Sequence, residues 1–151
     1  MNFIYTDGCN SDFITLCRLL DDWLNKRMGL EQTQYNQYNA LHDIHDVILV
    51  YENDEPIGCA SFKFHQTGVA EVKRVFVKNE YRNKGIAANL MNVIEDNAKQ
   101  KQVYELLLET GKPLIEAISL YKKIGYSVID NFGPYTNMPN SVCMRKLLWT
   151  V

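Results

Sequence analysis

The sequence predicts a mixed α/β (α+β) fold, with a central sheet of about seven mostly antiparallel strands flanked by about four helices. Strand-like and helical segments follow one another in the order β-α-α-β-β-β-α-β-α-β-β. Three of these strands are consecutive and are joined by short turns, which is typical of an antiparallel meander. The 151 residues show no repeat and no low-complexity segment, so residues 1–151 are expected to form a single domain.

The N-terminal part is expected to hold one short strand and two helices. Residues 3–5 are strand-like and end at Asp7-Gly8. Ser11 and Asp12 offer an N-cap for a helix. Apolar residues then recur at helical spacing, at Phe13, Leu16, Leu20, Trp23 and Leu24. The polar, tyrosine-rich stretch 31–45 is expected to contain the second helix.

The middle of the chain is expected to form the meander and a long helix. Strands are predicted at 47–51, 57–64 and 69–77, because turn residues separate these three apolar runs. After the polar loop 78–84, a helix is predicted to begin near Gly85. Its buried stripe is expected to consist of Ile86, Leu90, Val93 and Ile94.

The C-terminal part is expected to complete the sheet. A strand is predicted at 105–109 and a helix at 115–124, with Gly125 as its C-terminal cap. Two further strands are predicted at 126–129 and 141–148.

Composition limits the classes of partner. The formal charge is −2 and no basic face stands out, which argues against nucleic-acid binding. The sequence has no apolar run of membrane-spanning length, and its start lacks the pattern of a signal peptide. The four scattered cysteines suggest neither a zinc site nor a disulfide framework. A cytoplasmic protein without membrane or nucleic-acid partners is therefore expected.

A strand-to-helix segment, residues 75–88, has the features of an anion site. The first amides of a helix lack intrahelical acceptors and lie at the positive end of the helix dipole. Gly85 and Ala87 allow the backbone to approach a ligand, and Arg82 and Lys84 add positive charge. A pyrophosphate would fit there. Neither a GxxxxGK[ST] run nor a GxGxxG run is present, so two common nucleotide fingerprints are absent.

The spacing of Arg82, Gly85 and Ala87 after a strand ending in valine resembles the acetyl-CoA motif of the GNAT family of N-acetyltransferases. Residues 116–126, with Ala117, Tyr121 and a terminal Gly-Tyr, resemble the second signature of that family. The resemblance implies a sheet splayed at its middle, with coenzyme A in the opening. It implies acetyl-CoA as co-substrate, and it makes a homodimer an open expectation, because dimers are common in the family.

The resemblance also implies the residues of the cofactor site. Main-chain groups are expected to bind the pantetheine and the pyrophosphate, at Phe76, Val77, Arg82, Asn83, Lys84, Gly85, Ile86, Ala87 and Ala88. Tyr121 corresponds to the family's tyrosine near the cofactor sulfur. A phenol with a reference pKa of about 10 is a weaker acid than a thiol at about 8.5, so hydrogen bonding to the departing thiolate is its expected role. At Leu114 many relatives carry an asparagine that anchors the cofactor.

An acceptor amine must lose a proton before it attacks a thioester, so a general base is required. Glu71 precedes Arg82 by eleven residues, the spacing of the glutamate base in histone acetyltransferases of this family. Simple alternation places Glu71 on the face of Lys73 and opposite Val72 and Phe76, although a bulge would change this parity. The alternative for Glu71 is an ordinary solvated glutamate.

The loop 131–139 resembles the one before the last strand in bacterial small-molecule members of the family. Four aromatic residues are candidates for acceptor binding, namely Tyr135, Phe132, Tyr35 and Tyr38. His42 and His45 lie near two aspartates but lack a recognisable further ligand, so no metal is expected. The expected function is acetylation of a primary amine of a small molecule. Acetylation of a protein lysine or N-terminus is the alternative, and a CoA-binding sensor without catalysis is the alternative from another class.

Overall fold

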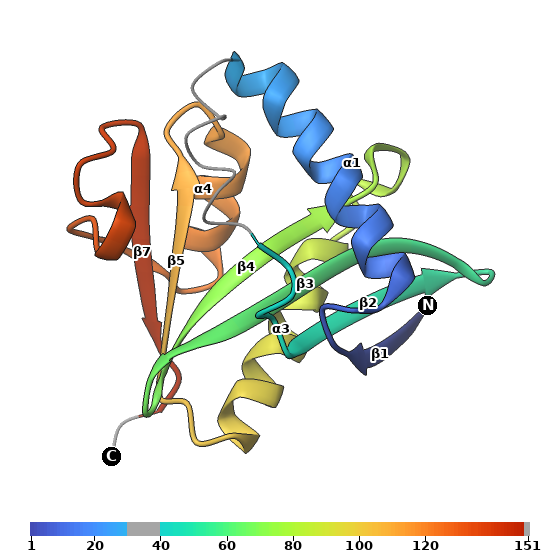
Figure 1. The fold of residues 1–151 in the computed structure, drawn as a ribbon, viewed down its shortest axis with the longest axis horizontal. Coiled ribbons are helices and arrows are strands. Elements are labelled where there is room, and N and C mark those ends of the chain that lie inside the picture. The colour runs from blue at the N-terminus through green and yellow to red at the C-terminus, as the bar shows by residue number, and fades with distance from the viewer. Residues whose placement is uncertain (30–39, 150–151) are drawn as a thin grey trace.

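The computed structural model describes residues 1–29 and 40–149 (Figure 1). The elements that follow one another along the chain are β1 (Asn2–Thr6), α1 (Ser11–Met28), β2 (Asp46–Glu52), β3 (Glu55–Gln66), β4 (Val69–Val77), α3 (Ile86–Gln100), β5 (Glu105–Gly111), α4 (Ile115–Lys123), β6 (Ser127–Ile129) and β7 (Ser141–Leu147). Two short 3-10 turns, Asn79–Tyr81 and Gly133–Tyr135, precede α3 and β7. Within the described ranges no helix is both long and apolar enough to cross a membrane.

The predicted sheet is confirmed. Seven strands lie in the order β1-β2-β3-β4-β5-β7-β6, and every neighbouring pair is antiparallel except β4 and β5. Each predicted strand is present, with ends that differ by a few residues. The described residues contain three α-helices, and most of the stretch in which a fourth was predicted lies outside them.

Helices cover both faces of the sheet (Figure 1). On one face α1 packs its stripe of Phe13, Leu16 and Leu20 against strand residues that include Leu49 and Phe76. The other face carries α3 and α4, whose buried residues join the strands in a larger core that includes Val72, Leu90, Ile94, Leu106 and Tyr121. Residues of β4 therefore face α1 or α3, and this choice decides which side chains can reach the site.

The start of α1 lies one residue earlier than predicted. Asn10, rather than Ser11 or Asp12, is the N-cap, and its side-chain oxygen accepts hydrogen bonds from the amides of Asp12 and Phe13 at 2.9 and 3.1 Å. An asparagine oxygen in an extended residue satisfies two amides that the helix leaves without partners.

A β-bulge interrupts β4 beside β3. Cys59 is opposite Phe76 but Ser61 is opposite Lys73, so β4 carries one extra residue here. Arg74 adopts the left-handed conformation, with φ of 59°. The Cys59 thiol donates to the Arg74 carbonyl at 3.2 Å, and the Ser61 hydroxyl donates to the Lys73 carbonyl at 2.5 Å. Two side chains of β3 thus bond the carbonyls that the bulge displaces.

The bulge corrects one sequence-based expectation. Strict alternation would place Glu71 and Phe76 on opposite faces of β4. Phe76 instead packs in the core beneath α1, whereas Val72 and Val77 pack in the core beneath α3. Glu71 alternates with Ala70 and Val72, so it lies on the α1 face together with Phe76.

Strands β4 and β5 separate after a short parallel pairing. Only three residue pairs join them, and the last is Glu71 with Leu107. Beyond this point the two strands diverge, as Figure 1 shows, and the rest of β5 pairs with β7 instead. The divergence opens the middle of the sheet next to the bulge, as the family resemblance implied.

Candidate active site

A cavity of about 410 Å³ lies where β4 and β5 diverge. Its walls come from α1, from both strands, from the start of α3 and from α4. Eight of the nine predicted cofactor residues line it, the exception being Lys84, and so do both predicted catalytic residues, Glu71 and Tyr121. The opening in the sheet therefore brings the loop motif and the strand carboxylate to a single space.

One end of the cavity is formed by the loop before α3. Gly85 is the N-cap of α3 and is left-handed, with φ of 79°, which a glycine adopts without steric cost. A β-carbon at Gly85 would meet no atom within 4 Å. No side chain of the described residues caps this helix, so the amides of Ile86, Ala87 and Ala88 are directed to the space in front of it. This arrangement suits a phosphate group.

The main chain of Val77 faces the opening. The Lys78 amide donates to the Ile57 carbonyl at 2.8 Å, so Val77 and Gly58 form a non-hydrogen-bonded pair in the antiparallel ladder. The amide and carbonyl of Val77 consequently point away from β3. The carbonyl of Phe76 points toward β3 and lies 3.0 Å from where a β-carbon of Gly58 would be.

Arg82 folds back over the end of β4. Its Nε donates to the Val77 carbonyl at 2.8 Å. Its guanidinium lies 4.8 Å from the ring centroid of Trp23 and 5.6 Å from that of Phe76. Trp23, which the sequence placed on the apolar stripe of α1, thus also lines the cavity and holds a cation there.

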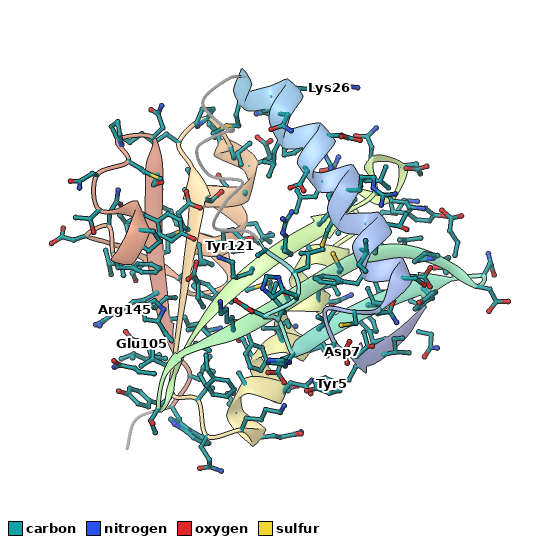
Figure 2. All side chains as sticks on the ribbon, in the orientation of Figure 1. Tyr5, Asp7, Lys26, Glu105, Tyr121 and Arg145 are labelled. Carbon is teal, nitrogen blue, oxygen red and sulfur yellow. The ribbon has the colours of Figure 1, made fainter. Side chains whose placement is uncertain are left out.

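Tyr121 is buried on α4 and borders the cavity (Figure 2). Its ring packs edge-on against Tyr126, with 5.8 Å between the centroids. Burial raises the pKa of its phenol well above the usual value, and the charge of Glu109 adds to this. Its hydroxyl has no hydrogen-bond partner among the described residues, so it is a neutral donor available to a ligand.

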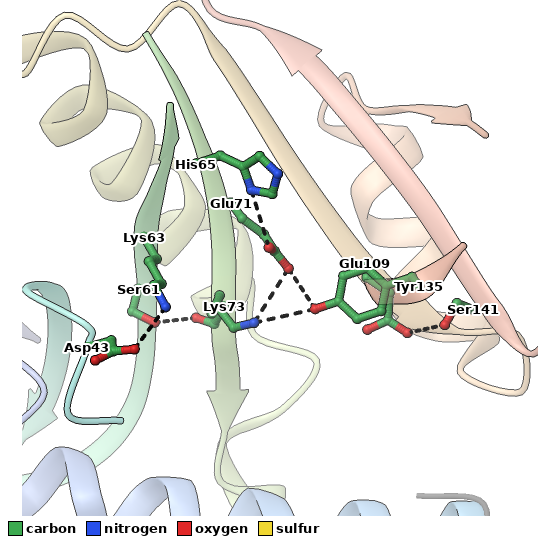
Figure 3. A network of polar contacts seen from close by, with 9 residues as sticks. All are labelled: Asp43, Ser61, Lys63, His65, Glu71, Lys73, Glu109, Tyr135 and Ser141. Atoms are coloured by element: carbon green, nitrogen blue, oxygen red, sulfur yellow. Dashed lines mark hydrogen bonds and ion pairs between the residues drawn. The ribbon is translucent and has the colours of Figure 1, made fainter. Parts of the chain in front are cut away.

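Glu71 is the centre of a polar network on the α1 face (Figure 3). Tyr135 donates to its Oε2 at 2.8 Å, Lys73 Nζ lies 3.6 Å from the same oxygen, and His65 Nδ1 lies 4.0 Å from Oε1. Glu71 is buried and lines the cavity, so it is not a solvated strand glutamate.

A second carboxylate, Glu109 on β5, also lines the cavity and was not predicted. Burial raises its pKa to about 7, although a hydrogen bond from Ser141 at 2.8 Å opposes this rise. Nearby Glu71 raises the pKa further. The sequence offered one signal for it, a glutamate at each end of the apolar strand 105–109, but the burial that makes Glu109 unusual is a property of the fold.

The predicted acceptor residues divide into three groups. Tyr135 lines the cavity. Phe132 does not, because its ring packs edge-on against Tyr135 and His65 at 5.4 and 5.7 Å. Tyr35 and Tyr38 lie outside the described residues.

Leu114, at the position where many relatives carry an asparagine, borders the cavity beside Glu116. Two nitrogens of Arg27 on α1 contact the Glu116 carboxylate at 2.9 and 3.3 Å.

Across residues 1–29 and 40–149, no group of three or more His, Cys, Asp and Glu side chains is arranged so that it could hold a metal ion.

Comparison with known proteins identifies relatives with this architecture. The chain is 39% identical over 93 residues to an IAA acetyltransferase of Azospirillum brasilense, a match that covers 61% of each chain. It is 32% identical over 100 residues to an uncharacterized N-acetyltransferase, YsnE, of Bacillus subtilis, a match that covers 65% of this chain and 66% of that protein. The chain therefore matches less than two thirds of the length of either relative.

Solved structures share the whole fold. A crystal structure from Klebsiella pneumoniae, of a protein assigned as an acyl-CoA N-acyltransferase, superposes with a TM-score of 0.83 at 28% identity and covers 98% of this chain and 97% of that one. Residues 15–126 match the sequence pattern of the acetyltransferase (GNAT) family. This range includes β4, the loop before α3, and α4. The chain is a member of the GNAT acetyltransferase family.

Proposed function

We propose that the protein transfers an acetyl group from acetyl-CoA to a primary amine of a small molecule by direct attack in a ternary complex. One observation carries this proposal. A single cavity joins an uncapped helix N-terminus, suited to a pyrophosphate, to a polar network around buried Glu71, and half-buried Glu109 lines the same cavity.

The cofactor half of the cavity suits acetyl-CoA. The amides at the start of α3 would hold the pyrophosphate, and Arg82, Asn83 and Lys84 in the preceding loop would add charge and main-chain donors. The outward carbonyl of Val77, which keeps one lone pair beside its bond from Arg82, would accept from the pantetheine lying as an added strand, since β4 has no neighbour on this side beyond Glu71. A GNAT structure from Elizabethkingia anophelis, which shares the fold at a TM-score of 0.70 and 19% identity, was solved with acetyl-CoA bound.

The chemistry follows from the groups around the opening. A carboxylate of the cavity takes a proton from the acceptor ammonium, directly or through water, and both Glu71 and Glu109 face this space. The free amine then attacks the thioester carbonyl, and the Val77 amide stabilises the developing oxyanion. Tyr121 donates a hydrogen bond to the departing thiolate from the opposite side of the sheet.

The acceptor class rests on the side chains beside Glu71 and on one relative. Tyr135 and the flank of α1 line the cavity together with Glu71, and this polar lining supports a small amine as the acceptor. The Azospirillum relative bears the name IAA acetyltransferase, which supports an acceptor of this kind. A homodimer and a cytoplasmic location stay predictions.

The proposal is tested by free-thiol release from acetyl-CoA against amines, amino acids and peptides. We expect small amines to give amine-dependent release, with formation of the acetylated amine confirmed by mass spectrometry. The variant Arg82→Ala should lose acetyl-CoA affinity, whereas Arg145→Ala, at a surface ion pair with Glu105, should keep it. Turnover with peptides alone would favour a protein acetyltransferase. Binding of acetyl-CoA without turnover of any compound in the panel would favour a sensor. Failure to bind acetyl-CoA would contradict the acetyltransferase and the sensor alike.

A further inference from the structure

Glu109 lies just past the point where the sheet opens on the β5 side. The last β4–β5 pair joins Glu71 to Leu107, and Glu109 follows Leu107 by two residues. Leu106 and Leu108 pack in the core beneath α3, so alternation places Glu109 on the α1 face, which Glu71 also occupies. The two carboxylates therefore face the same space from the two diverging strands.

The two carboxylates differ in their partners. Glu71 accepts a hydrogen bond from Tyr135 and lies within ion-pair distance of Lys73 and His65, so donors surround both of its oxygens. Glu109 accepts one hydrogen bond in the described part of the chain, from Ser141 to Oε2. Its Oε1 is left to receive a proton (Figure 3).

Glu109 also lies near the groups at the reacting end of the cofactor. The negative charge of Glu109 raises the pKa of the Tyr121 phenol across the opening. It also raises the pKa of the Tyr135 phenol on its own face. Glu109 therefore interacts electrostatically with the acceptor network and with the phenol proposed to stabilise the thiolate. The negative charge of Glu71 raises the pKa values of Tyr135, Cys143 and Glu109 itself.

We infer that Glu109 is the general base of the acetyl transfer and that Glu71 is a positioning residue that holds the acceptor ammonium beside it. The inference rests on the proposed function. In the step, the Glu109 carboxylate removes one proton from the ammonium, and the amine lone pair forms the bond to the thioester carbon. The C–S bond then breaks, the second amine proton passes to the sulfur with Tyr121 assisting, and Glu109 releases its proton to solvent. The products are the acetylated amine, coenzyme A and one proton.

The pH behaviour expected of Glu109 fits this role. A base works best when its pKa lies near the working pH, and burial brings that of Glu109 to about 7. The titratable groups that face it from the surrounding elements are Glu71 and Lys73 on β4, Tyr121 on α4, Tyr135 before β7 and Cys143 on β7. Among these, Glu71 raises its pKa and Lys73 lowers it.

The test is the pH dependence of kcat/KM for the best amine of the panel, with Glu109→Gln, Glu71→Gln and Glu105→Gln compared with the unmodified protein. Glu105 is the matched control, because it lies on the same strand and face but pairs with Arg145 outside the cavity. We expect Glu109→Gln to lower kcat by about 100- to 10,000-fold, which is the usual rate contribution of a general base. The variant should also lose the limb of the pH profile of kcat/KM that rises near pH 7. Glu71→Gln should raise KM for the amine and keep that limb at a lower pH, because the charge of Glu71 raises the pKa of Glu109. Glu105→Gln should match the unmodified protein.

A milder variant and a direct titration keep the test independent of folding. Ser141→Ala removes a donor that lowers the pKa of Glu109, so the limb should move to higher pH. The carboxyl carbon resonance of Glu109 is identified in a ¹³C NMR spectrum as the one that Glu109→Gln removes. We expect it to titrate near pH 7. A midpoint near that of an ordinary glutamate would overturn the inference, and this measurement needs no turnover.

The outcomes separate the two proposals. If the unmodified protein acetylates an amine and Glu109→Gln keeps both kcat and the limb, the assignment of Glu109 fails and the acetyltransferase stands. Loss of the limb in Glu71→Gln would transfer the role to Glu71. If the unmodified protein binds acetyl-CoA but acetylates nothing, the proposed function itself fails.

Discussion

Tyr135 donates its phenolic hydrogen to Glu71, with 2.8 Å between Oη and Oε2, although 64 residues separate the two in the sequence. The bond links the loop before β7 to β4 across the opening in the sheet. Lys73 Nζ lies 3.4 Å from the same phenolic oxygen. A hydroxyl thus connects the two charged residues that border the acceptor end of the cavity.

Tyr135→Phe removes this bond and keeps the ring. Because hydrogen bonds to charged groups contribute about 1.5–3 kcal/mol, we expect the free energy of unfolding to fall by about 2 kcal/mol and the KM for the amine to rise. Urea denaturation and steady-state kinetics measure both effects. Tyr104→Phe is the control, since Tyr104 is exposed and lies outside the cavity. An unchanged KM would show that Tyr135 does not orient Glu71 for the acceptor.

Tyr121→Phe should lower kcat by about 100-fold, because a donor to developing charge is lost. Stability should change little, since the hydroxyl has no partner within the described ranges. Tyr126→Phe is the opposite case. Its hydroxyl donates to buried Glu95 at 3.1 Å, so this variant should lose stability and keep kcat. Equal kcat values in Tyr121→Phe and the unmodified protein would exclude the proposed role.

Gly85→Ala should weaken acetyl-CoA binding by about tenfold, which corresponds to about 1.4 kcal/mol. The left-handed conformation at φ of 79° costs an alanine about 1–2 kcal/mol, and the new methyl group would enter the space in front of α3. Gly29→Ala is the matched control, because Gly29 also has a positive φ and open surroundings but lies outside the cavity. Isothermal titration calorimetry distinguishes the two, and equal affinity in both variants would contradict the assigned site.

Glu109 should make stability fall as pH rises from about 5 to 8. Its folded-state pKa of about 7 lies above its reference value of 4.5, so the folded protein binds the proton more tightly than the unfolded chain. The free energy of unfolding therefore decreases by at most about 3 kcal/mol as the pH rises from the lower pKa to the higher one. Above the higher pKa it levels off.

Denaturation of the unmodified protein and of Glu109→Gln at pH 5 and pH 8 measures this contribution. Other titrating groups are common to both proteins, so the difference between them isolates Glu109 to first order. A difference that does not change with pH would mean that burial does not perturb Glu109.

The loop that is proposed to hold the cofactor could be identified from sequence because its features are local. A strand, a basic loop and a glycine that opens a helix lie within 75–88, and helix amides bind anions whatever the rest of the chain does. Tyr121 was found by its position in a second short motif. The strands and helices were likewise readable from periodicity, with small errors at their ends, such as the cap of α1 at Asn10.

The acceptor side could not be predicted in the same way. The parity of β4 depends on a bulge whose displaced carbonyls bind Cys59 and Ser61 of a neighbouring strand, and strict alternation therefore misplaced Phe76. Phe132 resembled an acceptor residue in sequence, but its ring packs edge-on against Tyr135 and does not line the cavity.

The sequence by itself thus determined the order of the elements, the anion-binding loop and the family, because each depends on residues close together in the chain. The tertiary structure decided which carboxylates share the cavity and how their protons are held. Burial, neighbouring charges and hydrogen bonds set a carboxylate's pKa, and for Glu109 those neighbours come from β4 and β7.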